Sequence, residues 1–568
     1  MAFWQSQHRR SWLRGLLTVG SGVALALSLV AVLTGRSGIR FASWILPVRE
    51  IWRPLAVGAA LCAWRAVLAR RDRAASGPPH GQAGVADVLA GVVFACGITA
   101  AVLLSAHYQV RDCGGADSYG YVSTAHAAVS GTLIAPQPIV ALLPFADPLA
   151  AATPFGWTPR PSGDAIVPFY PLGFPLVMAA AIVVGGPTAP FYVPLLAGVG
   201  ILIATYRLTR QLAGSLVAGA TTLVVAFNPT LVNMAIQPMS DVPAAFWYLL
   251  SLAGVLVARE RPLLSGLAFG MSVWTRPLML LTAPAMWLVM SRTRRTFARW
   301  LLGAAAIGVV MAAFQWWLYG SPFKTGYGGA AGLFTTANLL ANAWAYAKWI
   351  VIINSPVFLV AVVVGIWKAP RRLAIAATVG FVLGVLPYVF KLAYFDDWDL
   401  VRYVLPVLIP CVIMASIGVA SVLARRLPHL AYVVALVAVS VGSAVVSYQF
   451  LASQATFQLG FQESRYPAVG AWVAAHTPPR AVVLAEGHAG SLRFYAHRTT
   501  LRLDQVPPRA LAPTVRRLAG EGIECYAVVD GAEEAEQFRQ QLLADPDVVA
   551  DPVGRVREAA ILRLREKS

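Results

Sequence analysis

The 568-residue chain is 58% hydrophobic and only 12% charged, and its formal net charge is +19. A soluble globular chain carries about 25% charged residues, so this composition excludes an ordinary soluble protein and indicates a polytopic membrane protein. The basic residues stand in short clusters between apolar runs, as cytoplasmic connectors do. We therefore expect the basic residues to interact with membrane lipids, and we do not expect the chain to bind nucleic acid.

The first third of the chain contains three apolar runs, 16–34, 46–69 and 87–107. Each has the roughly 20 residues that span a bilayer, and the first is typical of a retained signal anchor. Arginines precede the first run and separate the second from the third, so both clusters should be cytoplasmic. The third helix then ends on the opposite side. The sequence predicts that the following loop, 108–170, is extracytoplasmic.

This loop begins with a polar stretch and continues with many prolines. Residues 118–130 are predicted to form a short helix, which Gly131 is placed to end. Ten prolines lie between Pro136 and Pro175, and they argue against a regular spanning helix. We expect short helices on the membrane surface, and an interfacial or half-spanning element at 168–186.

Further apolar runs bring the predicted total to about 13 transmembrane helices, with the N-terminus cytoplasmic. Every basic connector then falls on one side of the membrane and every acidic or aromatic loop on the other. The remaining runs are 189–206, 214–233, 242–257, a hairpin of two short spans within 263–292, 299–318, 348–367, 373–390, 403–423 and 430–449.

From about residue 465 the composition becomes that of a soluble domain. Alternating strand and helix patterns predict a small extracytoplasmic α/β domain, in which the last strand, 559–564, lies at the edge of the sheet. We divide the chain into an N-terminal two-helix membrane extension (1–86), a transmembrane module (87–450) and this domain (451–568). The other predicted elements are strands at 481–485, 499–504 and 525–530 and helices at 511–518 and 532–543.

Several ionisable and aromatic residues gather on the outer face in this topology. Ionisable groups at a membrane are costly and usually face a cavity. A carboxylate opposite several cations suits a transfer reaction, because the carboxylate can take a proton from a hydroxyl as general base while cations stabilise a departing phosphate. The candidate base is Asp117, and the candidate substrate-binding residues are Tyr121, Asp241, Arg276, Lys324, Arg402 and Tyr403.

Each candidate also has a structural alternative. Asp117 and Asp241 precede predicted helices and could serve as N-caps. Arg276, at a hairpin tip, could extend to the membrane surface, and Arg402 could form a structural ion pair with Asp399. Tyr121 could be an anchor at the membrane interface.

Six short motifs in order along residues 87–425 carry a family resemblance. The motifs are Gly115-Ala-Asp117-Ser-Tyr-Gly-Tyr121, Tyr170-Pro-Leu-Gly-Phe-Pro175, Met239-Ser-Asp241-Val-Pro243, Gly270 to Arg276-Pro277, Gly320-Ser-Pro322 to Gly326-Tyr327, and Arg402-Tyr403-Val-Leu-Pro406. Together the motifs resemble the GT-C fold of polyprenyl-phosphate-sugar-dependent glycosyltransferases, close to protein O-mannosyltransferases and lipid A aminoarabinose transferases.

The resemblance implies that Asp117 matches the catalytic aspartate of the first outer loop. It implies an inverting transfer of one sugar from a polyprenyl-phosphate carrier to a hydroxyl of a glycan, lipid or protein, with no metal and no cofactor besides the lipid-linked donor. The chain departs from the family in three places. Two helices precede the usual first helix, Ser118 follows Asp117 where a second acidic residue is common, and Tyr170-Pro171-Leu172 replaces a Lys-Pro-Pro.

Two other functions fit the same residues. A lipid or polysaccharide transporter would bind and move its substrate without chemistry and would not need Asp117. A ligase would transfer a whole glycan from a lipid-pyrophosphate carrier and would call for more cations in the cavity.

Overall fold

The computed structural model describes residues 38–41, 44–47, 84–257, 260–291, 293–328 and 330–567. The predicted span at 16–34, nearly all of that at 46–69 and most of the predicted two-helix extension lie outside these residues. Within that part of the chain, β1 (Gly38–Phe41) and β2 (Trp44–Pro47) form an antiparallel pair that the sequence analysis did not predict.

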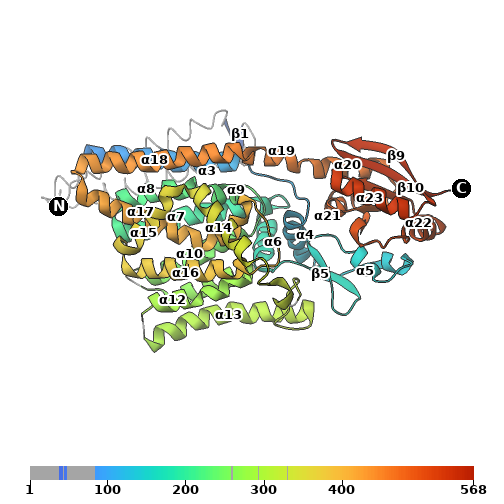
Figure 1. The fold of residues 1–568 in the computed structure, drawn as a ribbon, viewed down its shortest axis with the longest axis horizontal. Coiled ribbons are helices and arrows are strands. Elements are labelled where there is room, and N and C mark those ends of the chain that lie inside the picture. The colour runs from blue at the N-terminus through green and yellow to red at the C-terminus, as the bar shows by residue number, and fades with distance from the viewer. Residues whose placement is uncertain are drawn as a thin grey trace.

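A bundle of apolar helices makes up most of the molecule (Figure 1). The neighbours α3 and α18 lie along one side of it and α13 lies along the opposite side, while α10 and α17 form much of its buried centre. The bundle helices are α3 (Val85–His107), α7 (Val193–Ala213), α8 (Ser215–Ala226), α9 (Pro229–Ala235), α10 (Asp241–Leu256), α11 (Pro262–Thr275), α12 (Ala283–Val289), α13 (Arg294–Tyr319), α14 (Leu339–Asn354), α15 (Pro356–Lys368), α16 (Arg371–Val389), α17 (Leu405–Arg426) and α18 (His429–Ser453).

Among the described residues, six helices are long and apolar enough to cross a membrane, or up to eight if each of two bent pairs counts as one span. Three shorter apolar helices, Gly173–Gly185, Asp241–Leu256 and Pro277–Val289, add to the bundle. The chain is thus a mostly helical protein with several candidate spans. The total of about 13 is not confirmed in this part of the chain and stays a prediction.

Two runs that were predicted as single spans are bent instead. Within 214–233, α8 and α9 meet at 61°, because the Asn228 side chain accepts a hydrogen bond from the Leu231 amide at 3.1 Å and starts a new helix before Pro229. Within 348–367, α14 and α15 meet at 94°. Ser355 adopts φ +68° at that corner and a proline follows it, so the helix cannot continue straight through.

The loop after α3 forms short elements, as predicted. Helix α4 (Asp117–Val129) ends two residues before Gly131, whose φ of +70° lies in the left-handed region that glycine favours. Two short helices, η1 (Pro138–Leu142) and α5 (Pro148–Ala151), follow, and α6 (Gly173–Gly185) returns the chain to the bundle. A small antiparallel sheet in the order β3-β5-β4 was not predicted; its strands are Ala135–Pro136, Ala165–Pro168 and Trp157–Pro159.

The C-terminal segment contains a five-stranded sheet in the order β7-β6-β8-β10-β9. Strand β6 pairs in parallel with β7 and β8, while β10 pairs antiparallel with β8 and β9. The prediction that the last strand lies at the edge of the sheet is wrong, because β9, which was not predicted, pairs with its outer side. The sequence of β9 contains Asp-Pro-Val-Gly, and proline and glycine are uncommon inside strands, so the strand was not recognised. The elements are β6 (Val482–Ala485), β7 (Thr499–Arg502), β8 (Cys525–Val529), β9 (Val548–Val556), β10 (Ala559–Glu566), α20 (Arg465–His476), α22 (Leu511–Gly520) and α23 (Ala532–Ala544).

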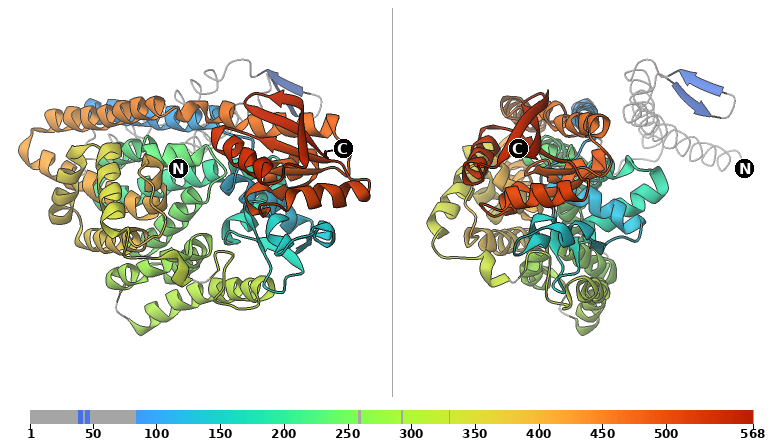
Figure 2. Two further views of the ribbon diagram at one scale, coloured as in Figure 1. Left: turned by 45° about the vertical axis from the view of Figure 1, so that its right-hand side comes forward. Right: turned by 90° about the vertical axis from the view of Figure 1, so that its right-hand side faces the viewer.

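The loop after α3 and the C-terminal segment pack together at one end of the helix bundle (Figures 1 and 2). Ile139, Leu143 and Ala151 of the loop belong to the same buried cluster as the strands and helices of the sheet. Arg493 adds hydrogen bonds to the Gln137 side chain at 2.8 Å and to a loop carbonyl oxygen. These contacts position α4, and with it Asp117, between the bundle and the sheet.

Candidate active site

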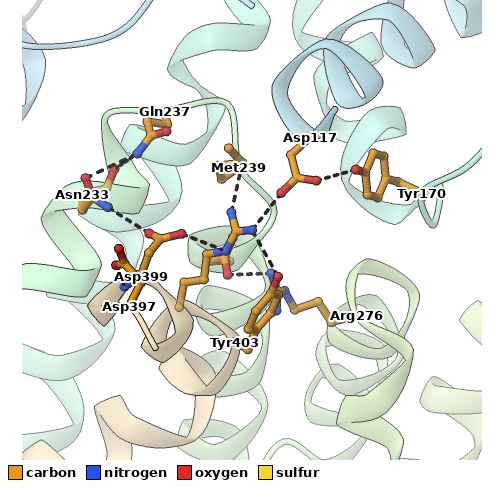
Figure 3. A network of polar contacts seen from close by, with 11 residues as sticks. Asp117, Tyr170, Asn233, Gln237, Met239, Arg276, Asp397, Asp399 and Tyr403 are labelled. Carbon is orange, nitrogen blue, oxygen red and sulfur yellow. Dashed lines mark hydrogen bonds and ion pairs between the residues drawn. The ribbon is translucent and has the colours of Figure 1, made fainter. Parts of the chain in front are cut away.

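Asp117 is the first residue of α4, and its carboxylate is held by groups from two distant parts of the chain. One oxygen accepts a hydrogen bond from Arg402 Nη2 at 2.9 Å, and the other accepts one from the hydroxyl of Tyr170 (Figure 3). The helix begins one residue earlier than predicted, and no side chain caps it. The capping alternative is therefore not realised, and the carboxylate faces the network rather than its own helix.

The turn before α4 fixes the direction of this carboxylate. Ser118 and Gly114 exchange two hydrogen bonds, at 2.8 and 3.1 Å, and Gly115 between them adopts φ +58°. Glycine reaches this backbone conformation without the steric cost that a Cβ would add. The glycine at position 115, the first residue of the motif, is thus explained by the geometry of the loop.

Arg402 is the centre of the network. Its guanidinium contacts Asp117, the Asp399 carboxylate at 3.3 Å, Met239 Sδ at 3.8 Å and the Tyr403 hydroxyl at 3.2 Å. The ion pair with Asp399 that was considered from the sequence is present, but it is only one of four contacts that the guanidinium makes. Asn233 donates to Asp399 at 3.3 Å and so holds that carboxylate in place (Figure 3).

Arg276 and Asp241 form a second ion pair, deeper in the protein. Arg276 Nη2 lies 2.5 Å from Asp241 Oδ1, and the two side chains are only 12% and 1% exposed. Arg276 follows the last turn of α11 and Asp241 begins α10, where its side chain makes no cap. The alternative that Arg276 extends to the membrane surface is wrong, because a buried carboxylate neutralises it. Its Nε is buried and has no hydrogen-bond partner among the described residues.

Three cations surround the ring of Tyr403. Arg276 Cζ lies 5.2 Å from the ring centroid, Arg402 Cζ 5.0 Å and Lys391 Nζ 4.3 Å. The negative face of an aromatic ring attracts cations at these distances. Lys391 follows α16 directly, and it makes no ion pair in the described part of the chain. Three positively charged side chains therefore lie close together around this ring, at one end of the bundle.

Tyr121 supports the site from inside rather than from the membrane interface. The side chain is buried, its hydroxyl shares a 2.9 Å hydrogen bond with Ser240, and its ring packs 4.6 Å from that of Tyr170. Burial, and then the nearby Asp117, raise the pKa of the Tyr170 hydroxyl, so it remains a hydrogen-bond donor to that carboxylate. Tyr121 thus orients Tyr170, which in turn orients the candidate base.

The structure does not bring Lys324 into this network. The residue is exposed on the loop after α13, and no described side chain makes a polar contact with its ammonium group. Two residues further along the same loop pack on the protein instead: Gly326 is buried against the backbone of Phe169, and the Tyr327 ring lies 4.8 Å from the Phe169 ring. The predicted substrate contact of Lys324 stays a prediction.

Sequence reasoning assigned no role to Tyr170, Met239 or Asn233, although Tyr170 and Met239 stand within the quoted motifs. The predicted topology places Lys391 on the outer face with the other cations, but Lys391 was not among the candidate site residues. Nothing in the sequence pattern pointed to Asn233, which lies within α9. Among the described residues, no group of three or more His, Cys, Asp or Glu side chains is arranged to hold a metal ion.

No protein-family model matches the chain, and no curated protein matches it in sequence. Solved structures with a similar fold do match it. ArnT from Cupriavidus metallidurans bound to undecaprenyl phosphate aligns with a TM-score of 0.53 at 13% identity, covering 83% of this chain and 97% of ArnT. The apo state of the same protein gives the same values. This chain has the GT-C fold.

The structural alignment extends over almost the whole length of ArnT. An Archaeoglobus fulgidus oligosaccharyltransferase tethered with an acceptor peptide also aligns, with a TM-score of 0.48 and 12% identity over 77% of this chain and 69% of that one. That score is too low to carry an argument. At these sequence identities the comparison establishes the fold.

Proposed function

We propose that this chain is a membrane glycosyltransferase that moves one sugar from a polyprenyl-phosphate carrier to a hydroxyl acceptor with inversion. The observation that carries the proposal is the carboxylate of Asp117 beside a cluster of cations at the end of a GT-C helix bundle. A lipid-phosphate donor is consistent with the undecaprenyl phosphate bound to ArnT.

Asp117 is the general base in this proposal. The carboxylate takes the proton of the acceptor hydroxyl while the acceptor oxygen forms a bond to the anomeric carbon. The bond between that carbon and the phosphate oxygen breaks, and its electron pair leaves with the phosphate. The products are the glycosylated acceptor, polyprenyl phosphate and protonated Asp117, so atoms and charge balance. Attack opposite the leaving group inverts the anomeric centre.

The cations around Tyr403 receive the phosphate. Arg402 has contacts to Asp117 and Asp399, so a phosphate oxygen competes with these carboxylates for the same guanidinium. Lys391, which has no carboxylate partner among the described residues, supplies a further positive charge. When the phosphate attracts Arg402, the Asp117 oxygen that Arg402 had engaged becomes available to accept a proton. Donor binding and activation of the base are coupled in this way.

The reaction is proposed to take place on the extracytoplasmic face, with the N-terminus cytoplasmic and the C-terminal domain extracytoplasmic. The cytoplasmic end of the bundle would then carry the basic connectors. In support, Ala213, Lys368 and Ala424 line one cavity, so the last turns of α7, α15 and α17, which lead into the basic connectors, meet at one place. Basic connectors gathered at one end are typical of a cytoplasmic surface. Figure 1 draws the C-terminal sheet beyond the other end of the bundle.

The test uses the full chain in lipid nanodiscs with polyprenyl-phosphate sugars and a panel of hydroxyl acceptors, and it measures released polyprenyl phosphate. Asp117→Asn keeps the side-chain shape but cannot take the proton, so its kcat should fall by about 10²–10⁴-fold. Asp547→Asn, on an exposed turn of the C-terminal segment, is the matched control and should keep full activity. Full activity of Asp117→Asn would overturn the base, and no lipid phosphate released with any donor would favour transport.

A further inference from the structure

A cavity of about 330 Å³ opens next to Asp117, on the side that faces the C-terminal segment. Three parts of the chain enclose it: the turn before α4, the 237–239 segment before α10, and the start of the C-terminal segment at Glu463 and Tyr466. Its size is at the low end of the range for small-molecule sites, about 300–1,000 Å³. It can hold about one or two sugar-sized groups and no long lipid chain.

The lining of this cavity is acidic. Asp112, Asp117 and Glu463 face it, and no lysine or arginine is among the residues that line it. Asp112 and Glu463 accept no hydrogen bond in the described part of the chain, so their oxygens remain available to a ligand. Burial raises the pKa of both carboxyl groups.

The nearest cations are engaged elsewhere. Arg465 lies 3.6 Å from Asp530 and donates to the Tyr466 hydroxyl at 3.1 Å. The guanidinium of Arg111 lies over the ring of Tyr192 at 5.6 Å, and Arg402 is held by Asp117 and Asp399 and is not among the residues that line the cavity. An anionic group in the cavity would therefore face Asp112 and Glu463, which have no ion-pair partner in the described part of the chain, and like-charge contacts of this kind are unfavourable.

Carboxylate oxygens that lack partners accept hydrogen bonds from hydroxyl groups. The lining also includes the aromatic side chain of Tyr466, which packs so tightly on the loop that a Cβ on Gly114 would lie 2.1 Å from the ring. A set of hydrogen-bond acceptors, one aromatic wall and no cation suits a neutral molecule that carries several hydroxyls. It does not suit a phosphate-bearing one.

We propose that this cavity is the acceptor site, that the acceptor is the hydroxyl of an uncharged carbohydrate, and that Glu463 and Tyr466 of the C-terminal segment help to select it. The inference rests on the proposed glycosyl transfer, because Asp117 is the wall of the cavity that takes the proton. It assigns substrate selection to the segment after α18.

The test measures binding and transfer separately. Saturation-transfer NMR on the full chain in nanodiscs, without donor, compares a neutral methyl hexoside with the same hexoside carrying a phosphate. The neutral compound should bind, and the phosphorylated one should bind at least tenfold more weakly. Glu463→Gln should weaken binding of the neutral hexoside about tenfold, and Glu463→Lys should also improve binding of the phosphorylated one.

Glu521→Lys, on the exposed turn after α22, makes the same charge change away from the cavity and should alter neither affinity. Transfer assays with the same compounds should show these effects in KM, with kcat changed less than twofold. Equal binding of neutral and phosphorylated hexosides, or no effect of Glu463→Lys, would overturn the acceptor site even if transfer occurs. Modification of a hydroxylated peptide but of no hexoside would overturn the carbohydrate assignment. Hexoside binding without released lipid phosphate would instead overturn the proposed transfer, and this inference with it.

Discussion

The carboxylate of Asp117 lies 2.9 Å from the guanidinium of Arg402, which is 285 residues away along the chain. The contact joins the first loop after α3 to the segment that begins α17. It also means that the candidate base and the donor phosphate would compete for the same cation. The coupling between donor binding and base activation that we propose depends on this single pair.

Replacing Arg402 should therefore lower the rate of sugar transfer more than it lowers the stability of the fold. We expect Arg402→Gln to lower kcat/KM for the donor by about 100-fold, the usual effect of removing one group that stabilises charge in the transition state. Arg402→Lys should recover little, because one ammonium group cannot contact Asp117, Asp399 and Tyr403 together. Initial rates of lipid-phosphate release at varied donor concentration measure both. The exposed Arg480→Gln is the control, and an Arg402→Gln rate within twofold of the parent protein contradicts the assignment.

The buried pair of Arg276 and Asp241 should be needed for stability as well as for substrate binding. Replacing either residue alone by alanine leaves an unpaired buried charge, which costs about 3–5 kcal/mol. The double variant removes both charges and should be less destabilised than either single variant. Thermal unfolding in detergent of the two single variants and the double variant gives the comparison. Additive losses in the double variant would mean that the two groups do not depend on each other.

Packing between Gly114 and Tyr466 should be essential to the position of the Asp117 loop. A Cβ at residue 114 would overlap the tyrosine ring, so Gly114→Ala must displace one of the two. We expect a stability loss of about 1–3 kcal/mol and a fall in kcat of about 100-fold, since small displacements of a catalytic group are costly. Gly91→Ala on α3, where a Cβ meets nothing within 4 Å, should lose neither stability nor activity. Equal behaviour of the two variants would show that the loop position is not set by this contact.

The C-terminal segment should lose stability in acid through Asp530. A hydrogen bond from His488, with Nε2 and Oδ2 3.0 Å apart, lowers the pKa of this carboxyl below its ordinary value of 3.8, and Arg465 acts in the same direction. A lowered folded-state pKa gives stability that is fully present well above pH 3.8 and is lost as pH falls below that value. Thermal unfolding midpoints between about pH 6 and pH 3 should decline less steeply in Asp530→Asn. An unchanged slope would assign the acid sensitivity to other carboxylates.

The apolar helices were predictable because a bilayer demands about 20 apolar residues for each span, and this signal is local. The positions of α3, α13, α16 and α18 follow from it closely. The end of α4 was predictable for a similar reason, since Gly131 has the conformational freedom that the turn requires. The bends within 214–233 and 348–367 were not predicted, although each has a proline at the corner, because hydropathy averages over such corners.

The fold class, the candidate base and most of the candidate substrate-binding residues could be predicted from composition, from the order of short motifs and from the sides to which basic connectors point. The pairings among these residues could not be predicted and are seen only in the folded protein. Arg402 joins Asp117, Arg276 joins Asp241, Tyr170 donates to Asp117, and Lys324 stays outside the network. No local periodicity encodes contacts across hundreds of residues. The packing of the bundle against the loop and the C-terminal sheet brings these groups within hydrogen-bonding distance.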